Sequence, residues 1–470
     1  MMLPRRTRRL VDAAVAAVIF VAVAAVATVL WLGSDARATS DDIAAPGSVP
    51  PTPASATAVP AALHQVWELT TDPRYGTVVS PYGSVITADD HAVVGHDATT
   101  GRQLWSYTRS NRDLCAIGSG DTTADGLSTW SGVHGVMTLF AKNGYCSQVT
   151  LLNPTTGERL YQRTSPNQDP GQLFFGSPYV GWMGSDYLEL WRHDLVATIR
   201  YGNQPNPVNA NGPHLGCTFS DAAVTTDQLA TIEHCGGTTN LVLNWPTPAD
   251  APGNDKGWDA NHSTPKATID LKSHDAVIVG ITADRVAVLV SQPSPAIVVY
   301  DASGDETSRK PVDVSAAEIT QTAAAGITPS VVYQTRRYTL VGHHLVAFSS
   351  QTVNVPAPPP TTTVAPQSGG DVTAGAGSST VSSPPTPETV SVANPVLDWV
   401  APDAVGLPTR VADSIVVPTA AGLAMRTVVT GDVTRVIPVQ RGGYTGRVDV
   451  TSVGTVLVET RGAAVVGLAG

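Results

Sequence analysis

Residues 97 to 108 read DATTGRQLWSYT, and this stretch decides the fold. The Asp97 side chain can accept a hydrogen bond from the backbone N–H two residues further along, and Gly101 can adopt a positive φ. The chain is therefore expected to reverse here between two strands. Trp105 follows on the second strand. Burying a tryptophan against a neighbouring sheet is strongly stabilising and needs no ligand. The stretch therefore predicts a hairpin whose outer strand carries a wedge between two sheets.

The same unit recurs along the chain. Short apolar runs separated by turn residues surround the first copy, at residues 76–80, 84–88, 92–97 and 102–108. Four antiparallel strands in meander order make one blade of a β-propeller. Later copies of the turn and its aromatic are weaker, and their residues are Asn153, Gly157, Tyr161 and Trp399.

The end of the chain predicts how the ring closes. Residues 446–470, GRVDVTSVGTVLVETRGAAVVGLAG, offer three strands and lack a fourth. QVWEL at residues 65–69 stands alone before the first unit, with Trp67 in the position of Trp105. We expect this strand to complete the last blade and to remove the open edges. The prediction is an all-β propeller of eight blades over residues 63–470.

A low-complexity segment at residues 355–392 interrupts the sixth unit. Its neighbours predict a third strand at residues 343–350 and a fourth at residues 395–400. The segment is therefore expected to be a disordered insertion in one blade, which is tolerated because loop-closure entropy grows only logarithmically with length. It could be a plain spacer, a second contact element or a glycosylated segment.

The N-terminus predicts a membrane anchor. Residues 1–9 are a basic tail and residues 10–33 an apolar run, long enough to cross a hydrocarbon core of ~30 Å as a helix. The basic tail should stay in the cytoplasm and the propeller outside. A cleaved signal peptide is the alternative, since Ala36-Arg37-Ala38 has the form of a cleavage site. Residues 34–62 are polar, small and Pro-rich, and predict a flexible stalk.

Composition and cysteines agree with this location. The net charge of −11 argues against a nucleic-acid partner. The four cysteines are well separated and lie after the apolar run, where disulfides persist. Of the possible pairings, the local ones are favoured, Cys115 with Cys146 and Cys217 with Cys235. A zinc site by these thiols is not expected, because closely spaced pairs are missing.

The spacing of Asp97, Gly101 and Trp105, with its weaker copy at Asn153, Gly157 and Tyr161, resembles the tryptophan-docking repeat of the PQQ-like eight-bladed β-propeller superfamily. That superfamily includes quinoprotein alcohol dehydrogenases and an outer-membrane assembly lipoprotein of Gram-negative bacteria. The whole chain also resembles a group of uncharacterised actinobacterial membrane-anchored propeller proteins. The resemblance implies the fold and does not imply the cofactor.

The sequence offers only weak signals for a catalytic, cofactor-binding or metal-binding site. The quinoproteins resemble one another in a pair of adjacent cysteines, which this chain lacks. Asp121 to Gly126 has acidic spacing without the final Glu of a calcium loop, and we expect a solvated turn. Glu233-His234-Cys235 is interpreted as a half-cystine with exposed neighbours, and His343-His344 as split across a strand. His193 and His214 are interpreted as lone histidines. No catalytic, cofactor-binding or metal-binding residue is predicted.

The sequence favours a non-catalytic, membrane-anchored scaffold outside the cytoplasm, binding an envelope protein or cell-wall polymer. One alternative is a PQQ-dependent alcohol or sugar dehydrogenase, which would require PQQ and Ca²⁺. A second is a small-molecule sensor with its ligand in the central channel. The short N-terminal tail argues against direct signalling across the membrane.

Overall fold

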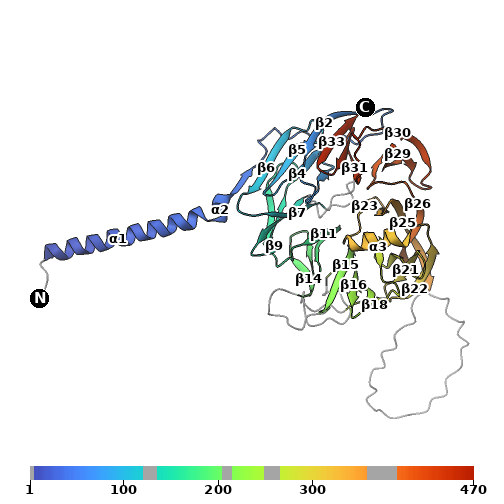
Figure 1. Cartoon of the computed structure of the whole chain (residues 1–470), viewed down its shortest axis with the longest axis horizontal. Helices are drawn as coiled ribbons and strands as arrows, with labels where there is room; N and C mark the ends of the chain where they lie inside the picture. The colour runs from blue at the N-terminus through green and yellow to red at the C-terminus, as the bar shows by residue number, and fades with distance from the viewer. Residues whose placement is uncertain (1–4, 120–134, 204–213, 248–264, 357–388) are drawn as a thin grey trace, which may run out of the picture.

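The computed structural model describes residues 5–119, 135–203, 214–247, 265–356 and 389–470. These residues form a ring of eight antiparallel sheets, with one long helix projecting from its rim (Figure 1). The predicted all-β propeller of eight blades is confirmed.

Seven blades are built from consecutive strands in meander order. Blades 1 and 2 comprise β3 (Val78–Ser80), β4 (Ser84–Ala88), β5 (Ala92–Asp97), β6 (Gln103–Arg109), then β7 (Leu114–Gly118), β8 (Val136–Lys142), β9 (Tyr145–Leu152) and β10 (Arg159–Thr164). Blades 3 and 4 comprise β11 (Gly171–Gly176), β12 (Tyr179–Gly184), β13 (Tyr187–Arg192), β14 (Ala197–Gly202), then β15 (Cys217–Val224), β16 (Leu229–Cys235), β17 (Thr238–Asn244) and β18 (Ala267–Asp270).

Blades 5 and 6 comprise β19 (Ala276–Ile281), β20 (Arg285–Val290), β21 (Ala296–Asp301), β22 (Glu306–Pro311), then β23 (Ser330–Tyr333), β24 (Arg336–Val341), β25 (His344–Pro356) and β26 (Thr389–Ala401). Blade 7 comprises β27 (Thr409–Val411), β28 (Ser414–Thr419), β29 (Gly422–Thr427) and β30 (Val433–Ile437). A short helix, α3 (Ala316–Ala324), joins blade 5 to blade 6.

Blade 8 is shared between the two ends of the propeller. Its inner strands are β31 (Val448–Val453), β32 (Val456–Arg461) and β33 (Ala464–Ala469). β2 (His64–Thr70) pairs antiparallel with β33 and becomes the outermost strand of this blade. The ring therefore closes as predicted.

The hydrophobic core lies between the blades. One cluster, for example, combines Ile232 and Leu241 of blade 4 with Val288 and Val298 of blade 5. Strand alternation explains this arrangement, since each sheet presents one row of apolar side chains to each neighbour. The first strands of successive blades, such as β7, β11, β23 and β31, lie around the centre of the ring (Figure 1).

The insertion in blade 6 is shorter than predicted. β25 and β26 pair as far as Pro356 with Thr389, so the third and fourth strands extend well beyond residues 343–350 and 395–400. The sequence TVSVANPVLDWVA from Thr389 is rich in β-branched residues, which favours the extended ladder. Residues 357–388, the rest of the predicted insertion, lie outside the described residues.

The N-terminal helix α1 spans Arg5–Leu32. It begins earlier than residue 10, because the basic tail continues the helix. Its segment Arg9–Leu32 is apolar and long enough to cross a membrane, and its side chains are exposed. A signal sequence would have the same features.

Residues 34–62 do not form the predicted stalk. They contain a helical turn, α2 (Asp35–Ala38), and a strand, β1 (Thr39–Asp42), which pairs with β6 as a fifth strand of blade 1. Further on, Val59 is buried, and the Arg435 side chain donates to the carbonyls of Val59 and Pro60 at 2.9 and 3.0 Å. The segment lies along the ring because long-range contacts compensate for its lack of apolar side chains.

Candidate functional site

Trp105 joins blade 1 to blade 2. Its side chain is 1% exposed, and its Nε1 donates to the carbonyl of Pro154 at 3.0 Å. The indole lies on Gly157, where a Cβ atom would come within 2.7 Å of the ring. Asn153 holds this turn by accepting from the backbone N–H groups of Thr155 and Thr156. The turn thus presents bare backbone to the tryptophan of the preceding blade.

Trp67 and Trp399 make the same contact at other blade junctions. Trp67 of blade 8 donates to the carbonyl of Ala98 at 3.0 Å and covers Gly101, in the turn that Asp97 begins. Trp399 of blade 6 donates to the carbonyl of Val428 at 3.1 Å and covers Gly431 in blade 7. The ring closure is therefore secured by the same device as an internal junction.

Tyr161 does not act as a wedge. Its side chain is 39% exposed, although its position in the repeat matches Trp105. At the junction of blades 2 and 3, Glu189 is fully buried and accepts from Arg163 at 3.0 Å and Arg200 at 3.1 Å. This polar network accompanies an apolar cluster that includes Trp182 and Trp191, and the turn motif could not indicate it.

The cysteines form the two local disulfides favoured by sequence, Cys115–Cys146 and Cys217–Cys235. In this state they offer no thiolate to a metal ion. The calcium-like stretch at residues 121–126 lies outside the described residues.

Glu233 differs from its predicted role as an exposed neighbour of a half-cystine. It is fully buried and accepts from His214 Nδ1 and Thr231 Oγ1, each at 2.7 Å. His214 is therefore not a lone histidine. Because side chains alternate along a strand, His234 points to the other face and contacts Ser220 and Thr239. The group serves packing within blade 4 rather than assembling one site.

His344 also has a defined partner. Its ring lies 3.2 Å from Glu318 of α3, and the same carboxylate oxygen accepts the backbone N–H of His343.

Asp35 connects the apolar helix to the ring. Its carboxylate accepts from Asn111 at 2.9 Å, Arg112 at 2.7 Å and Lys142 at 3.1 Å, with Arg109 3.6 Å away. Hydrogen bonds from Asn111 and then Arg112 and Lys142 hold the pKa of this carboxyl well below its usual range, against the effect of burial. We call this cluster the Asp35 clamp. The partners lie far along the sequence, so no local motif indicates it.

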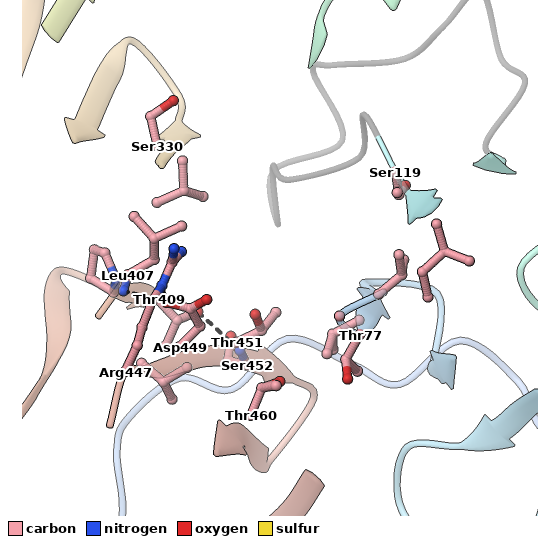
Figure 2. A pocket seen from close by; sticks show the side chains of 18 of the residues that line it. Thr77, Ser119, Ser330, Leu407, Thr409, Arg447, Asp449, Thr451, Ser452 and Thr460 are labelled. Carbon is pink, nitrogen blue, oxygen red and sulfur yellow. Dashed lines mark hydrogen bonds and ion pairs between the residues drawn. The ribbon is translucent and has the colours of Figure 1, made fainter. Parts of the chain in front are cut away.

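A cavity of about 500 Å³ opens in the central channel (Figure 2). Arg447 and Asp449 form an ion pair of 2.9 Å on one side of it, and Thr77 and Ser119 lie on the other. The Asp449 oxygen in this pair also accepts the backbone N–H of Leu407 at 2.8 Å. Hydroxyl groups dominate the remaining polar lining, from Ser330, Tyr333, Thr409, Thr451, Ser452 and Thr460.

The described lining of this cavity does not supply the calcium ligands that the quinoprotein alternative requires. Calcium takes six or more oxygen ligands, usually with several carboxylates. Among the described residues lining this cavity, Asp449 alone carries a carboxylate, and it is occupied by Arg447 and Leu407. The lining is suited to hydrogen bonding with a polar ligand and not to a calcium-held quinone.

No protein-family model matches the chain, and no curated protein matches its sequence. Solved structures do match its fold. The C-terminal WD40 domain of Sif2 is 8% identical, over 88% of this chain and 99% of that domain, with a TM-score of 0.50. BamB from Moraxella catarrhalis is 11% identical, over 87% of this chain and 98% of its own, with a TM-score of 0.42. At such low identity, the likeness to the Sif2 domain is one of fold, and it establishes the β-propeller alone.

Proposed function

We propose that the protein is a membrane-anchored β-propeller outside the cytoplasm, acting as a non-catalytic scaffold for an envelope protein or a cell-wall polymer. The observation that carries this proposal is the direct connection between the apolar helix and the closed ring. The Asp35 clamp and β1 attach the helix to blades 1 and 2 without a flexible spacer. A ring attached in this way would be held at a fixed distance from the membrane and in a fixed orientation.

The location is supported by two further features. Basic residues precede the apolar segment, which favours a cytoplasmic N-terminus and an external propeller. Both disulfides are formed, as suits an oxidising compartment.

Blade 7 offers an apolar surface for a partner. Three valines of its outer strand and preceding turn are unusually exposed: Val429 at 63%, Val433 at 48% and Val436 at 43%. Exposed apolar groups on an outer strand are typical of interaction sites, because they combine with an unpaired strand edge.

The test is crosslinking in intact cells that express the full-length protein, followed by mass spectrometry. We expect one enriched protein or cell-wall fragment, which is lost when Val433 and Val436 are both changed to Lys. Val196→Lys is the matched control, since Val196 is a 41% exposed valine on blade 3, and it should leave the crosslink intact.

Two outcomes would contradict the proposal. The first is the absence of any enriched partner with the folded wild-type protein. The second is dye reduction by the purified protein with PQQ, Ca²⁺ and an alcohol or sugar, which would make it an enzyme.

A further inference from the structure

A second cavity, of about 490 Å³, adjoins the first in the channel and shares Ile117, Phe175 and Leu407 with it. Arg337, on the second strand of blade 6, lines this cavity. Its Nε is buried and has no hydrogen-bond partner, and within the described residues its guanidinium makes no ion pair. Burial lowers the pKa of Arg337, and the nearby charge of Asp221 partly opposes this. Arg337 is thus a partly buried cation that lines the cavity without an acceptor.

Asp221 cannot act as that acceptor. One of its carboxylate oxygens accepts the backbone N–H groups of Ala222 and Thr328, at 2.9 and 3.0 Å. The other accepts the N–H of Ile278 at 2.7 Å and the hydroxyl of Thr328 at 2.6 Å. An ionised carboxylate has about four lone-pair sites, and these contacts fill them.

The cavity has an excess of positive charge. Its described lining contains Arg74, Arg337 and Arg447 and no acidic residue. Arg74 is paired with Asp72 at 2.5 Å, and Arg447 with Asp449 at 2.9 Å, so both have a counter-ion. Arg337 alone of these three lacks one. Among these lining residues, one cation lacks an ion-pair partner, which matches a monoanion better than a phosphate dianion.

The walls around Arg337 are apolar and fixed. Leu173, Phe174 and Ile327 line the cavity beside the residues it shares with the first one. The Gln172 side chain donates to the carbonyl of Ala325 and accepts the N–H of Ile327, at 2.8 and 2.7 Å. The loop between α3 and β23 is therefore tied to blade 3 on one side and to Asp221 on the other. A pocket held in this way is formed before a ligand arrives.

We infer that this cavity binds an organic carboxylate with an apolar body, its carboxylate paired with Arg337 and its body against the aromatic and aliphatic wall. The guanidinium is planar and can donate two parallel hydrogen bonds to one carboxylate. A free acid or the carboxyl terminus of a partner protein could carry this group. The inference does not depend on the scaffold proposal, because it concerns binding by the purified protein.

The test is calorimetric titration of the full-length protein in detergent with phenylacetate, and with phenylacetamide as the uncharged analogue. We expect phenylacetate to bind and the amide not to. Arg337→Met should lower the affinity for phenylacetate by roughly tenfold or more, while Arg337→Lys retains part of this affinity. Arg309→Met is the matched control, since Arg309 pairs with Glu306 at 2.7 Å on the outer strand of blade 5. It should bind as the wild type does.

The melting temperature separates binding from structure. Removing a partly buried charge that has no ion-pair partner should not lower the melting temperature, so Arg337→Met is expected to melt at or above the wild-type temperature. If acetyl-Ala-Phe binds more tightly than phenylacetate, the natural ligand is the carboxyl terminus of a polypeptide. If phenylacetate binds more tightly, the natural ligand is a free acid. The inference is overturned if neither binds, if Arg337→Met binds phenylacetate unchanged, or if inorganic phosphate binds and both carboxylates do not.

Discussion

Trp105 shows how much one aromatic residue contributes to a blade junction. Trp105→Ala removes a buried indole and the hydrogen bond to Pro154, so we expect a loss of about 3–5 kcal/mol in the free energy of unfolding. Tyr161→Ala, at the matching position of blade 2, should cost less than about 1 kcal/mol because its ring is exposed. Urea unfolding of both variants measures the difference. Equal losses would show that the docking contact is not what stabilises the junction.

The sequence predicts residues that act within a repeat and misses those that act alone. The turn-and-aromatic spacing identifies Trp67 and Trp399, because that spacing has a local physical cause. Arg337 stands in an ordinary alternating strand, and its lack of a partner depends on how Asp221 is bonded elsewhere in the fold. Such a feature becomes visible only when distant segments are placed together.

The helix α3 is fixed at its start by a charged capping box. Ser315 and Glu318 bond each other's backbone, and Glu318 also accepts from His343. Although burial acts to raise the pKa of Glu318, the hydrogen bonds from Ser315 and His343 outweigh it and lower the pKa to about 2. A lowered carboxyl pKa stabilises the fold above the unfolded value near 4.5, and this stabilisation is lost as the pH falls through about 2.

We therefore expect Glu318→Gln to cost about 1 kcal/mol at pH 6, because Gln replaces a charged acceptor with a weaker one. The difference from the wild type should shrink as the pH is lowered from 4.5 towards 2. Chemical unfolding of both proteins across this pH range measures it. A difference that does not change with pH would rule out the charge of Glu318 as its cause.

Two strands from the N-terminal part of the chain, β1 and β2, pair with the outer edges of blades 1 and 8 and have different roles. β2 completes the last blade, whereas β1 lies outside a blade that already has four strands. Replacing residues 64–70 with a Gly/Ser segment of equal length should lower the melting temperature and promote association through the exposed edge of β33. The same replacement at residues 39–42 should leave the melting temperature nearly unchanged. Thermal unfolding with light scattering compares them, and a similar effect of both would contradict closure by β2.

At this scale, the sequence predicts the ring and its closure but not the attachment of the N-terminal segment. Residues 34–62 have a composition typical of a spacer, and composition reports only how much apolar surface a segment can bury. The contacts that hold the segment are polar and long-range, such as Asp35 with Lys142 and Asp41 with Arg159 at 2.8 Å. Charge pairs of this kind leave no periodic pattern in either partner.

The closing strand pair also bears on how the protein is made. Apart from the extra strand β1, β2 precedes all other strands of the eight blades, and its partner β33 follows them. The ring cannot close until the ribosome has translated β33. A polypeptide that stops early would keep β2 without its partner and would expose an unpaired edge, which invites degradation or aggregation. The geometry of blade 8 thus makes synthesis as far as β33 a condition for a closed ring.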